Sequence, residues 1–165
     1  MHSEPSSSGA PFGRFSSQDE QALLQQAASL RVAAQRRERR RPLQGRCLGL
    51  MGSGDEQALQ VFRQAALELG AHVATLSAQL DEHSSPEQIA AIGRMLGRLY
   101  DAVECQGMSP ALVSQLAAAT SVPVYAGLAS GEHRLAGLAA DWPLAVPLDD
   151  KRRWLIQAAL LSSLA

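Results

Sequence analysis

The sequence predicts an α/β fold: one domain with a four-stranded, mainly parallel sheet and helices on both faces. Short apolar runs, typical of buried strands, alternate with stretches in which apolar residues recur every three or four positions, typical of amphipathic helices. The length of 165 residues suits one domain, and 46% hydrophobic residues suffice for a core. Right-handed crossovers between parallel strands then place helices on both faces of the sheet.

Four segments are predicted to be strands: residues 47–51, 72–76, 102–105 and 122–125. The first is followed by Gly-Ser-Gly, which indicates a tight turn into the next helix. Pro123 near the start of the last segment favours an edge strand or the first position of a strand.

The first predicted helix begins at a capping box formed by Ser17 and Glu20 and ends at Pro42. The arginines of residues 36–41 would then lie in its last turn, where they complement the helix dipole. Its predicted inner face consists of Leu23, Ala27, Leu30 and Ala34.

Three further helices are predicted between the strands. One is closed by Gly70, one starts with Ser85, Pro86 and a capping-box Gln88, and one starts at Ser109. Their predicted inner faces are, in order, Ala58, Phe62, Ala65 and Leu69; Ile89, Ile92, Leu96 and Leu99; and Leu112, Val113 and Leu116.

The chain is predicted to have three parts. Residues 1–14 are rich in Ser, Pro and Gly and are expected to be a disordered tail. Residues 15–148 form the α/β domain, and residues 149–165 form a helix that packs on it, capped by Asp149 or Asp150. The predicted inner face of this last helix holds Trp154, Leu155, Ala158 and Leu161.

Composition excludes several classes of protein. With 16 acidic and 15 basic residues the net charge is −1, which argues against a generally basic nucleic-acid binder. The arginines of residues 36–41 have no interleaved aromatics for base stacking, so a solvated helix end is favoured over nucleic-acid binding. No apolar run is long enough for a membrane span, and the first residues do not resemble a secretory signal. We therefore expect a cytoplasmic protein whose Cys47 and Cys105 are buried free thiols.

Ligands of open parallel sheets bind beyond the carboxyl ends of the strands, and three predicted loops lie there. The first contains Ser53, Gly54 and Asp55. Small residues would let backbone amides approach an anion, but Gln57 stands where a dinucleotide fingerprint has its third glycine. A tight turn capped by Asp55 is therefore favoured over a phosphate site.

The other two loops carry side chains that could bind a small ligand. Gln106 follows the third strand, next to Cys105, for which packing is favoured over nucleophilic chemistry. His133 and Arg134 follow the fourth strand and could bind an oxyanion or a carbonyl group, although a lone histidine is more often structural. No metal-ligand spacing and no nucleophile elbow is present, so neither metal nor cofactor is expected.

Several phrases, taken in order, resemble the carbamoyl-phosphate-binding half of the ornithine/aspartate carbamoyltransferase family, the ornithine branch most closely. They are L-Q-G-R-C-L-G-L-M at 43–51, L-E-L-G-A-H at 67–72, R-M-L-G-R-L-Y-D-A at 94–102 and S-V-P-V-Y-A-G-L at 121–128. The resemblance covers about residues 16–165. Residues 150–161 are similar to the family's final helix, which returns from the second domain, so the resemblance implies that the amino-acid-binding domain is missing.

The departures from the family pattern concern its site residues. The family's phosphate loop, Ser-Thr-Arg-Thr-Arg, falls on residues 55–59, where Gln57 replaces an arginine and Asp55 a serine. The arginine that polarises the carbamoyl carbonyl is replaced by Gln106, while His133 keeps its family position and Arg134 replaces a proline. Phosphate recognition depends on charge-assisted hydrogen bonds, which these residues cannot make in the same way.

We therefore expect a non-catalytic carbamoyltransferase-like domain with an association or regulatory role. The resemblance implies a homo-oligomer, with a trimer favoured, or association with an active carbamoyltransferase, and we expect no nucleic acid or membrane partner. Two alternatives stay open: a related enzyme or small-ligand binder with altered chemistry, and a nucleotide-binding Rossmann-like module that uses residues 52–54. The candidate catalytic residue is His133, and the candidate ligand-binding residues are Ser53, Gly54, Asp55, Gln57, Gln106 and Arg134.

Overall fold

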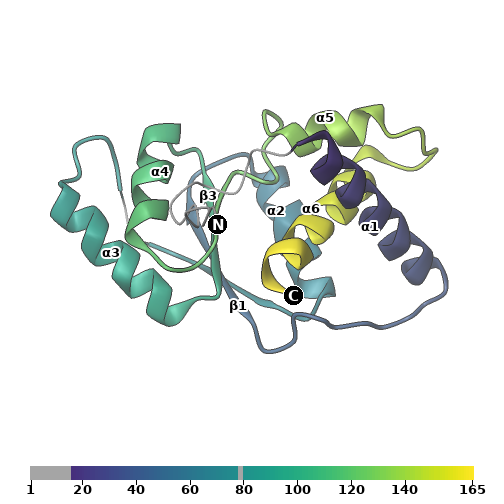
Figure 1. Cartoon of the computed structure of the whole chain (residues 1–165), viewed down its shortest axis with the longest axis horizontal. Coiled ribbons are helices and arrows are strands. Elements are labelled where there is room, and N and C mark those ends of the chain that lie inside the picture. The colour runs from purple at the N-terminus through teal and green to yellow at the C-terminus, as the bar shows by residue number, and fades with distance from the viewer. Residues whose placement is uncertain (1–15, 78–79) are drawn as a thin grey trace, which may run out of the picture.

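The computed structural model describes residues 16–77 and 80–165, and its centre is one sheet of four parallel strands (Figure 1). The order across the sheet is β2-β1-β3-β4, so β2 and β4 are the edges. The fold class predicted from the sequence is confirmed, whereas the predicted tail at residues 1–14 lies outside the described residues. The strands are β1 (Cys47–Gly52), β2 (His72–Thr75), β3 (Ala102–Gln106) and β4 (Val124–Ala126).

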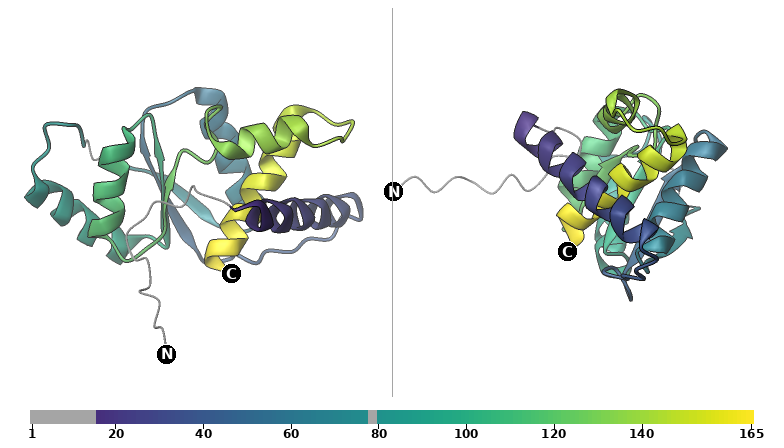
Figure 2. Two further views of the ribbon diagram at one scale, coloured as in Figure 1. Left: turned by 45° about the horizontal axis from the view of Figure 1, so that its top comes forward. Right: turned by 90° about the vertical axis from the view of Figure 1, so that its right-hand side faces the viewer.

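The helices form a layer on each face of the sheet, as Figures 1 and 2 show. On one face, α3 and α4 pack against each other; on the other lie α2, α5 and α6, with α1 packed on α6. The helices are α1 (Ser17–Gln35), α2 (Glu56–Glu68), α3 (Pro86–Leu99), α4 (Pro110–Ala119), α5 (Arg134–Asp141) and α6 (Leu148–Leu164). No helix in the described part of the chain is both long and apolar enough to cross a membrane.

Alternation along β3 divides its side chains between two apolar cores. Ala102 belongs to the core under α2 and α6, while Val103 and Cys105 belong to the core under α3 and α4. Glu104 and Gln106 therefore point toward the α2 and α6 side, although both are buried. This alternation brings two polar side chains to the carboxyl end of the strand, where we expected a site.

The last helix, α6, is the most deeply buried helix of the described chain. Residues 154–161 are all buried, so burial extends around the whole helix rather than along the single face that we predicted. Its N-cap is Pro147, which offers no side-chain hydrogen bond; the prediction that Asp149 or Asp150 caps the helix is wrong. Both carboxylates lie instead in the first turn, where their negative charge interacts favourably with the positive end of the helix dipole.

The first helix differs from its prediction at both ends. Its capping box is formed by Ser16 and Asp19, one residue earlier than expected. It ends at Gln35, because Arg37 adopts a left-handed φ of 56° and its N–H donates to the Ala34 carbonyl. The N–H of Glu38 donates to the carbonyl of Ala33, which completes a Schellman-type turn. The arginines therefore follow the helix instead of filling its last turn.

Smaller differences concern individual side chains. Leu99 and Ala34 are exposed, although both were predicted on inner faces, and Cys47 is only half-buried. β4 begins two residues later than predicted, because Pro123 has no N–H to donate to a neighbouring strand. The carbonyl of Pro123 still accepts a hydrogen bond from the Val103 N–H. The predicted N-caps at Asp55, Ser85 and Ser109 are confirmed, whereas α5 was not predicted.

Candidate functional site

The carboxyl ends of β1 and β3 interlock through two glycines. Gly52 pairs with Gln106 in the parallel register, and both Gly52 and Gly107 have positive φ, at 91° and 67°. A Cβ atom on Gly52 would collide with the Gln106 backbone oxygen, and one on Gly107 with the Ser53 backbone oxygen. Only glycine allows this approach, so the loop after β1 lies directly against the loop after β3.

Gln106 is buried beneath the first loop. Only 3% of the residue is exposed, and a Cβ atom on Gly54 would lie 3.0 Å from its side-chain Oε1. Its side-chain amide lies beside the Glu104 carboxyl and partly lowers the pKa of that carboxyl. Apart from this contact, Nε2 has no hydrogen-bond partner among the described residues. Ser53 and Gly54 are exposed above it. The structure thus brings together three of the predicted site residues, but Gly54 covers the one amide that could reach a ligand.

Glu104 is a buried carboxyl that the sequence analysis missed. Its Oε1 accepts hydrogen bonds from the backbone N–H groups of Gly127 at 2.8 Å and Leu128 at 3.0 Å. Burial raises its pKa to about 8, although these amides partly lower it. The side chain is therefore mostly protonated at neutral pH and holds the loop after β4 in place. A glutamate within the apolar run of residues 102–105 was the signal that could have revealed it.

Asp55 and Gln57 act within the fold at the start of α2. Asp55 is the N-cap, and its Oδ1 accepts from the Gln57 N–H at 3.2 Å. The Gln57 side chain points toward α6, where Nε2 donates to Asp149 Oδ2 at 2.6 Å. The side chain of Gln57 is therefore bound to another helix.

His133 and Arg134 are adjacent in sequence but serve different contacts. His133 is the N-cap of α5, and its Nδ1 accepts from the Leu135 N–H at 3.1 Å. Burial lowers the pKa of this imidazole, which favours the neutral form that can accept at Nδ1. Arg134 binds Glu20 of α1 through Nε at 2.7 Å and Nη2 at 3.2 Å. Its hydrogen bond lowers the pKa of the Glu20 carboxyl.

Arg152 of α6 is a second residue that sequence reasoning missed. Its guanidinium donates to the carbonyl of Ala129 in the loop after β4, and it lies 3.7 Å from Asp149. The loop is thus held at its amides by Glu104 and at a carbonyl by Arg152. Both arginines beside the strand ends, Arg134 and Arg152, already have acceptors inside the protein.

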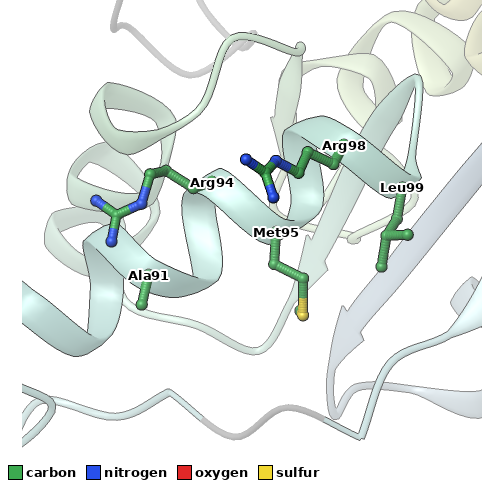
Figure 3. A pocket seen from close by; sticks show the side chains of 5 residues that line it. All are labelled: Ala91, Arg94, Met95, Arg98 and Leu99. Carbon is green, nitrogen blue, oxygen red and sulfur yellow. The ribbon is translucent and has the colours of Figure 1, made fainter.

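The strand ends offer limited chemistry in the part of the chain that the structure describes. Burial and the charge of Glu104 raise the pKa of Cys105 to about 12, so this thiol packs and does not act as a nucleophile. No group of three His, Cys, Asp or Glu side chains within residues 16–77 and 80–165 could hold a metal ion. A groove of about 280 Å³ lies between α2 and α6, lined by Gln57 and Asp149 among others. Another, of about 300 Å³, runs along the outer side of α3 (Figure 3).

The sequence matches a family model and several curated proteins. Residues 12–140 match the "Aspartate/ornithine carbamoyltransferase, carbamoyl-P binding domain". The catabolic ornithine carbamoyltransferase of Mycoplasma capricolum subsp. capripneumoniae is 39% identical over 72 residues, which are 44% of this chain and 23% of that protein. The ornithine carbamoyltransferase of Actinobacillus pleuropneumoniae serotype 5b (strain L20) is 36% identical over 72 residues, 44% of this chain and 22% of that protein.

Solved structures share the fold at low sequence identity. The ornithine carbamoyltransferase of Burkholderia thailandensis E264 has a TM-score of 0.69 and 20% identity, over 80% of this chain and 47% of that chain. The enzyme from Pyrococcus furiosus gives 0.68 and 22%, over 81% and 44%. A putative aspartate carbamoyltransferase of Leishmania major Friedlin gives 0.65 and 19%, over 80% and 43%. The matched region is thus less than half the length of each of these proteins.

Proposed function

The chain belongs to the aspartate/ornithine carbamoyltransferase family, and we propose that it is a non-catalytic member of it that works by association with other chains. The proposal combines two claims. One is that the strand-end site has lost carbamoyl-phosphate binding; the other is that the domain keeps a role as an assembly partner. Each claim has its own support and its own test.

The observation that carries the first claim is that the arginines and the Gln57 amide at the strand ends already bind acceptors within the protein. Gln57 donates to Asp149, Arg134 binds Glu20, and Arg152 binds a backbone carbonyl. A phosphate needs charge-assisted donors directed at it, and arginine supplies them in bidentate form. Among the described residues at this edge, the arginines have acceptors within the fold.

Acidic side chains at the start of α2 support the same claim. Asp55 and Glu56 begin this helix, at positions that the resemblance assigns to the family's phosphate loop. An anion near these carboxylates loses the electrostatic gain that the amide groups at a helix N-terminus would otherwise provide. The local charge thus opposes the ligand that the family's domain is named for.

Titration calorimetry with carbamoyl phosphate tests this claim directly. We expect no binding heat at millimolar ligand for the full chain, whereas an ornithine carbamoyltransferase of the family serves as the positive control. The pair Gln57→Arg and Gln106→Arg restores the charges, and a gain of binding in this variant would attribute the loss to those positions. Micromolar binding by the unaltered chain would contradict the proposal.

A small-ligand binder is the second candidate, and one observation favours it. Among the residues that the structure describes, the buried Nε2 of Gln106 has no partner other than the neighbouring Glu104 carboxyl, and it lies at the edge where such folds bind ligands. A neutral carbonyl compound could accept from this donor if the loop at Gly54 opened. Thermal shift with carbamoyl compounds, comparing the chain with Gln106→Ala, tests it; equal shifts in both would rule it out.

The second claim, association, follows from the family resemblance and predicts a trimer. Light scattering of the full chain at tens of micromolar should then report the mass of three chains of 17.6 kDa each. A mixed assembly with an active carbamoyltransferase is the other form of the proposal, and co-purification with such an enzyme would detect it. A monomer that also fails to bind the enzyme would contradict the claim.

A further inference from the structure

The outer face of α3 exposes apolar side chains next to each other. Met95 is 39% exposed and Leu99 59%. Together with Ala91 they line the groove along this helix (Figure 3). The helix lies at one end of the molecule, packed beside α4, as Figures 1 and 2 show. Adjacent apolar side chains at an accessible end of a protein are typical of an interaction surface.

Charged side chains of both signs share this face. Glu87, Ala91, Arg94 and Arg98 are spaced i, i+4, i+7 and i+11, so they form one line along the helix. Figure 3 shows both guanidinium groups along the opposite edge of the helix from Met95. None of these three charged side chains forms an ion pair with a described residue. The two arginines are also like charges at i and i+4, which is unfavourable without a counter-charge.

We propose that this face pairs two copies of the chain, with the two α3 helices antiparallel about a two-fold axis. When the axis passes between Ile92 and Gly93, Glu87 of one copy faces Arg98 of the other, and the same pair recurs on the far side of the axis. At this register Ala91 of one copy lies level with Arg94 of the second copy and one residue from its Met95, so a small side chain lies beside two large ones. The face is therefore complementary to itself in charge at the two Glu87–Arg98 pairs, and in side-chain size next to the axis.

The proposal rests on the association role proposed above and names a surface that carries it. An α-helix of 14 residues is about 21 Å long, so two such helices cover less than the ~1,600 Å² of a standard stable interface. We therefore expect reversible pairing with a dissociation constant on the order of 10 μM. If the chain is already a trimer through other contacts, the same pairing joins two trimers, so the mass doubles in either case.

Charge exchange tests the geometry. Sedimentation equilibrium of the full chain at several concentrations would compare the wild type with Glu87→Arg, Arg98→Glu and the double variant. Each single change puts like charges together at both symmetric positions and should weaken pairing about tenfold or more. The double variant restores opposite charges and should pair within about threefold of the wild type. Arg36→Glu, an exposed arginine outside α3, is the matched control and should leave pairing unchanged.

A second variant covers the case in which charge reversal disturbs the fold. Met95→Gln keeps the helix and its charges but replaces an apolar contact, so it should also weaken pairing. Singles that pair as well as the wild type, or a double variant that does not recover, would overturn the proposal. A trimer insensitive to all these changes would overturn it as well, yet would leave the proposed function intact, because the carbamoyl-phosphate titration measures the latter separately.

Discussion

Polar side chains at the strand ends are paired within the protein, whereas the arginines on the outer face of α3 form no ion pair with a described residue. At the strand ends, Gln57, Arg134 and Arg152 all have acceptors in distant parts of the chain. On α3, Arg94 and Arg98 are exposed and have no ion pair with any residue that the structure describes. At the edge where the fold ordinarily binds ligands, these three side chains are paired within the protein, while groups available to a partner lie on an outer helix.

This difference teaches where to look for function in a degenerate member of an enzyme family. The fold alone directs attention to the carboxyl edge of the sheet. Side-chain pairing shows instead which groups are still free to bind a ligand or another chain. Whether a group is free depends on partners that lie far away in the sequence. Four predictions, from the largest expected effect to the smallest, can break or sharpen this comparison.

Removal of residues 149–165 should have the largest effect, because α6 packs against α1, α2 and α5. Each large apolar side chain that it buries contributes about 1.5–3 kcal/mol, and several of them together approach the ~5–15 kcal/mol net stability of a domain. The truncated chain should be unfolded or aggregated by circular dichroism and light scattering. Within the full chain, Trp154→Ala should lower the free energy of unfolding by about 3–5 kcal/mol.

The control for this prediction is Leu148→Ala, at the exposed start of the same helix, which should change the free energy of unfolding by less than about 0.5 kcal/mol. A truncated chain that keeps its melting temperature would mean that α6 is peripheral.

The interlocked glycines should give the next largest effect. Gly107→Ala places a Cβ at positive φ and against the Ser53 backbone, so we expect a loss of about 2–4 kcal/mol in urea unfolding. Gly131→Ala is the matched control: nothing lies within 4 Å of its added Cβ, and the change should stay below about 1 kcal/mol. Equal losses at both positions would mean that the two loops can move apart.

The buried carboxyl predicts a pH dependence of stability. The pKa of Glu104 is about 8 in the folded chain against an ordinary 4.5, so between these values the folded state binds more protons than the unfolded state. The free energy of unfolding therefore falls as pH rises from about 5 to 8, by up to ~1.4 kcal/mol per pH unit, and levels off above the folded pKa. Urea denaturation at pH 5, 6.5 and 8 measures this slope.

Glu104→Gln keeps an oxygen that can accept from Gly127 and removes the titration, so its slope should be flatter and its stability at pH 8 higher than that of the wild type. Glu132→Gln, an exposed glutamate, should keep the wild-type slope. Identical slopes in the wild type and Glu104→Gln would show that this carboxyl is not the group responsible.

The smallest expected effect compares the two regions directly. A double-mutant cycle of Gln57→Ala and Asp149→Ala should yield a coupling of about 0.5–1 kcal/mol, because a single hydrogen bond joins them. At monomeric concentrations, Arg94→Ala on α3 should change stability by less than about 0.5 kcal/mol. A coupling near zero would mean that the Gln57 side chain is not held by Asp149, and it would weaken the contrast between the strand ends and α3.

The sheet and most helices could be predicted because their signals are local. The caps at Ser85 and Ser109 are formed within three residues of sequence. Each predicted strand is likewise an apolar run of only four or five residues. The helix α5 was missed because it has eight residues and its N-cap is His133, which is not among the preferred capping residues. The spacing of Leu135, Leu138 and Ala139 was the available signal.

The site could be predicted only as a set of positions. Sequence reasoning placed Gln57 and Arg134 at the strand ends, but their side chains bind Asp149 and Glu20, 92 and 114 residues away. Local patterns carry no information on such pairings. The same holds for Glu104, whose role depends on the backbone of Gly127, 23 residues later, and on burial on the α2 and α6 side of the sheet.

The packing of α1 on α6 has a consequence for how the protein is made. α1 leaves the ribosome more than a hundred residues before the helix that covers it, and contacts this distant in sequence slow folding. During that interval the apolar side of α1, with Leu23 and Ala27, is open to water and to other nascent chains. Synthesis in a cell-free system, arrested before and after residue 164 has left the ribosomal tunnel, would show chaperone binding in the first case and its release in the second.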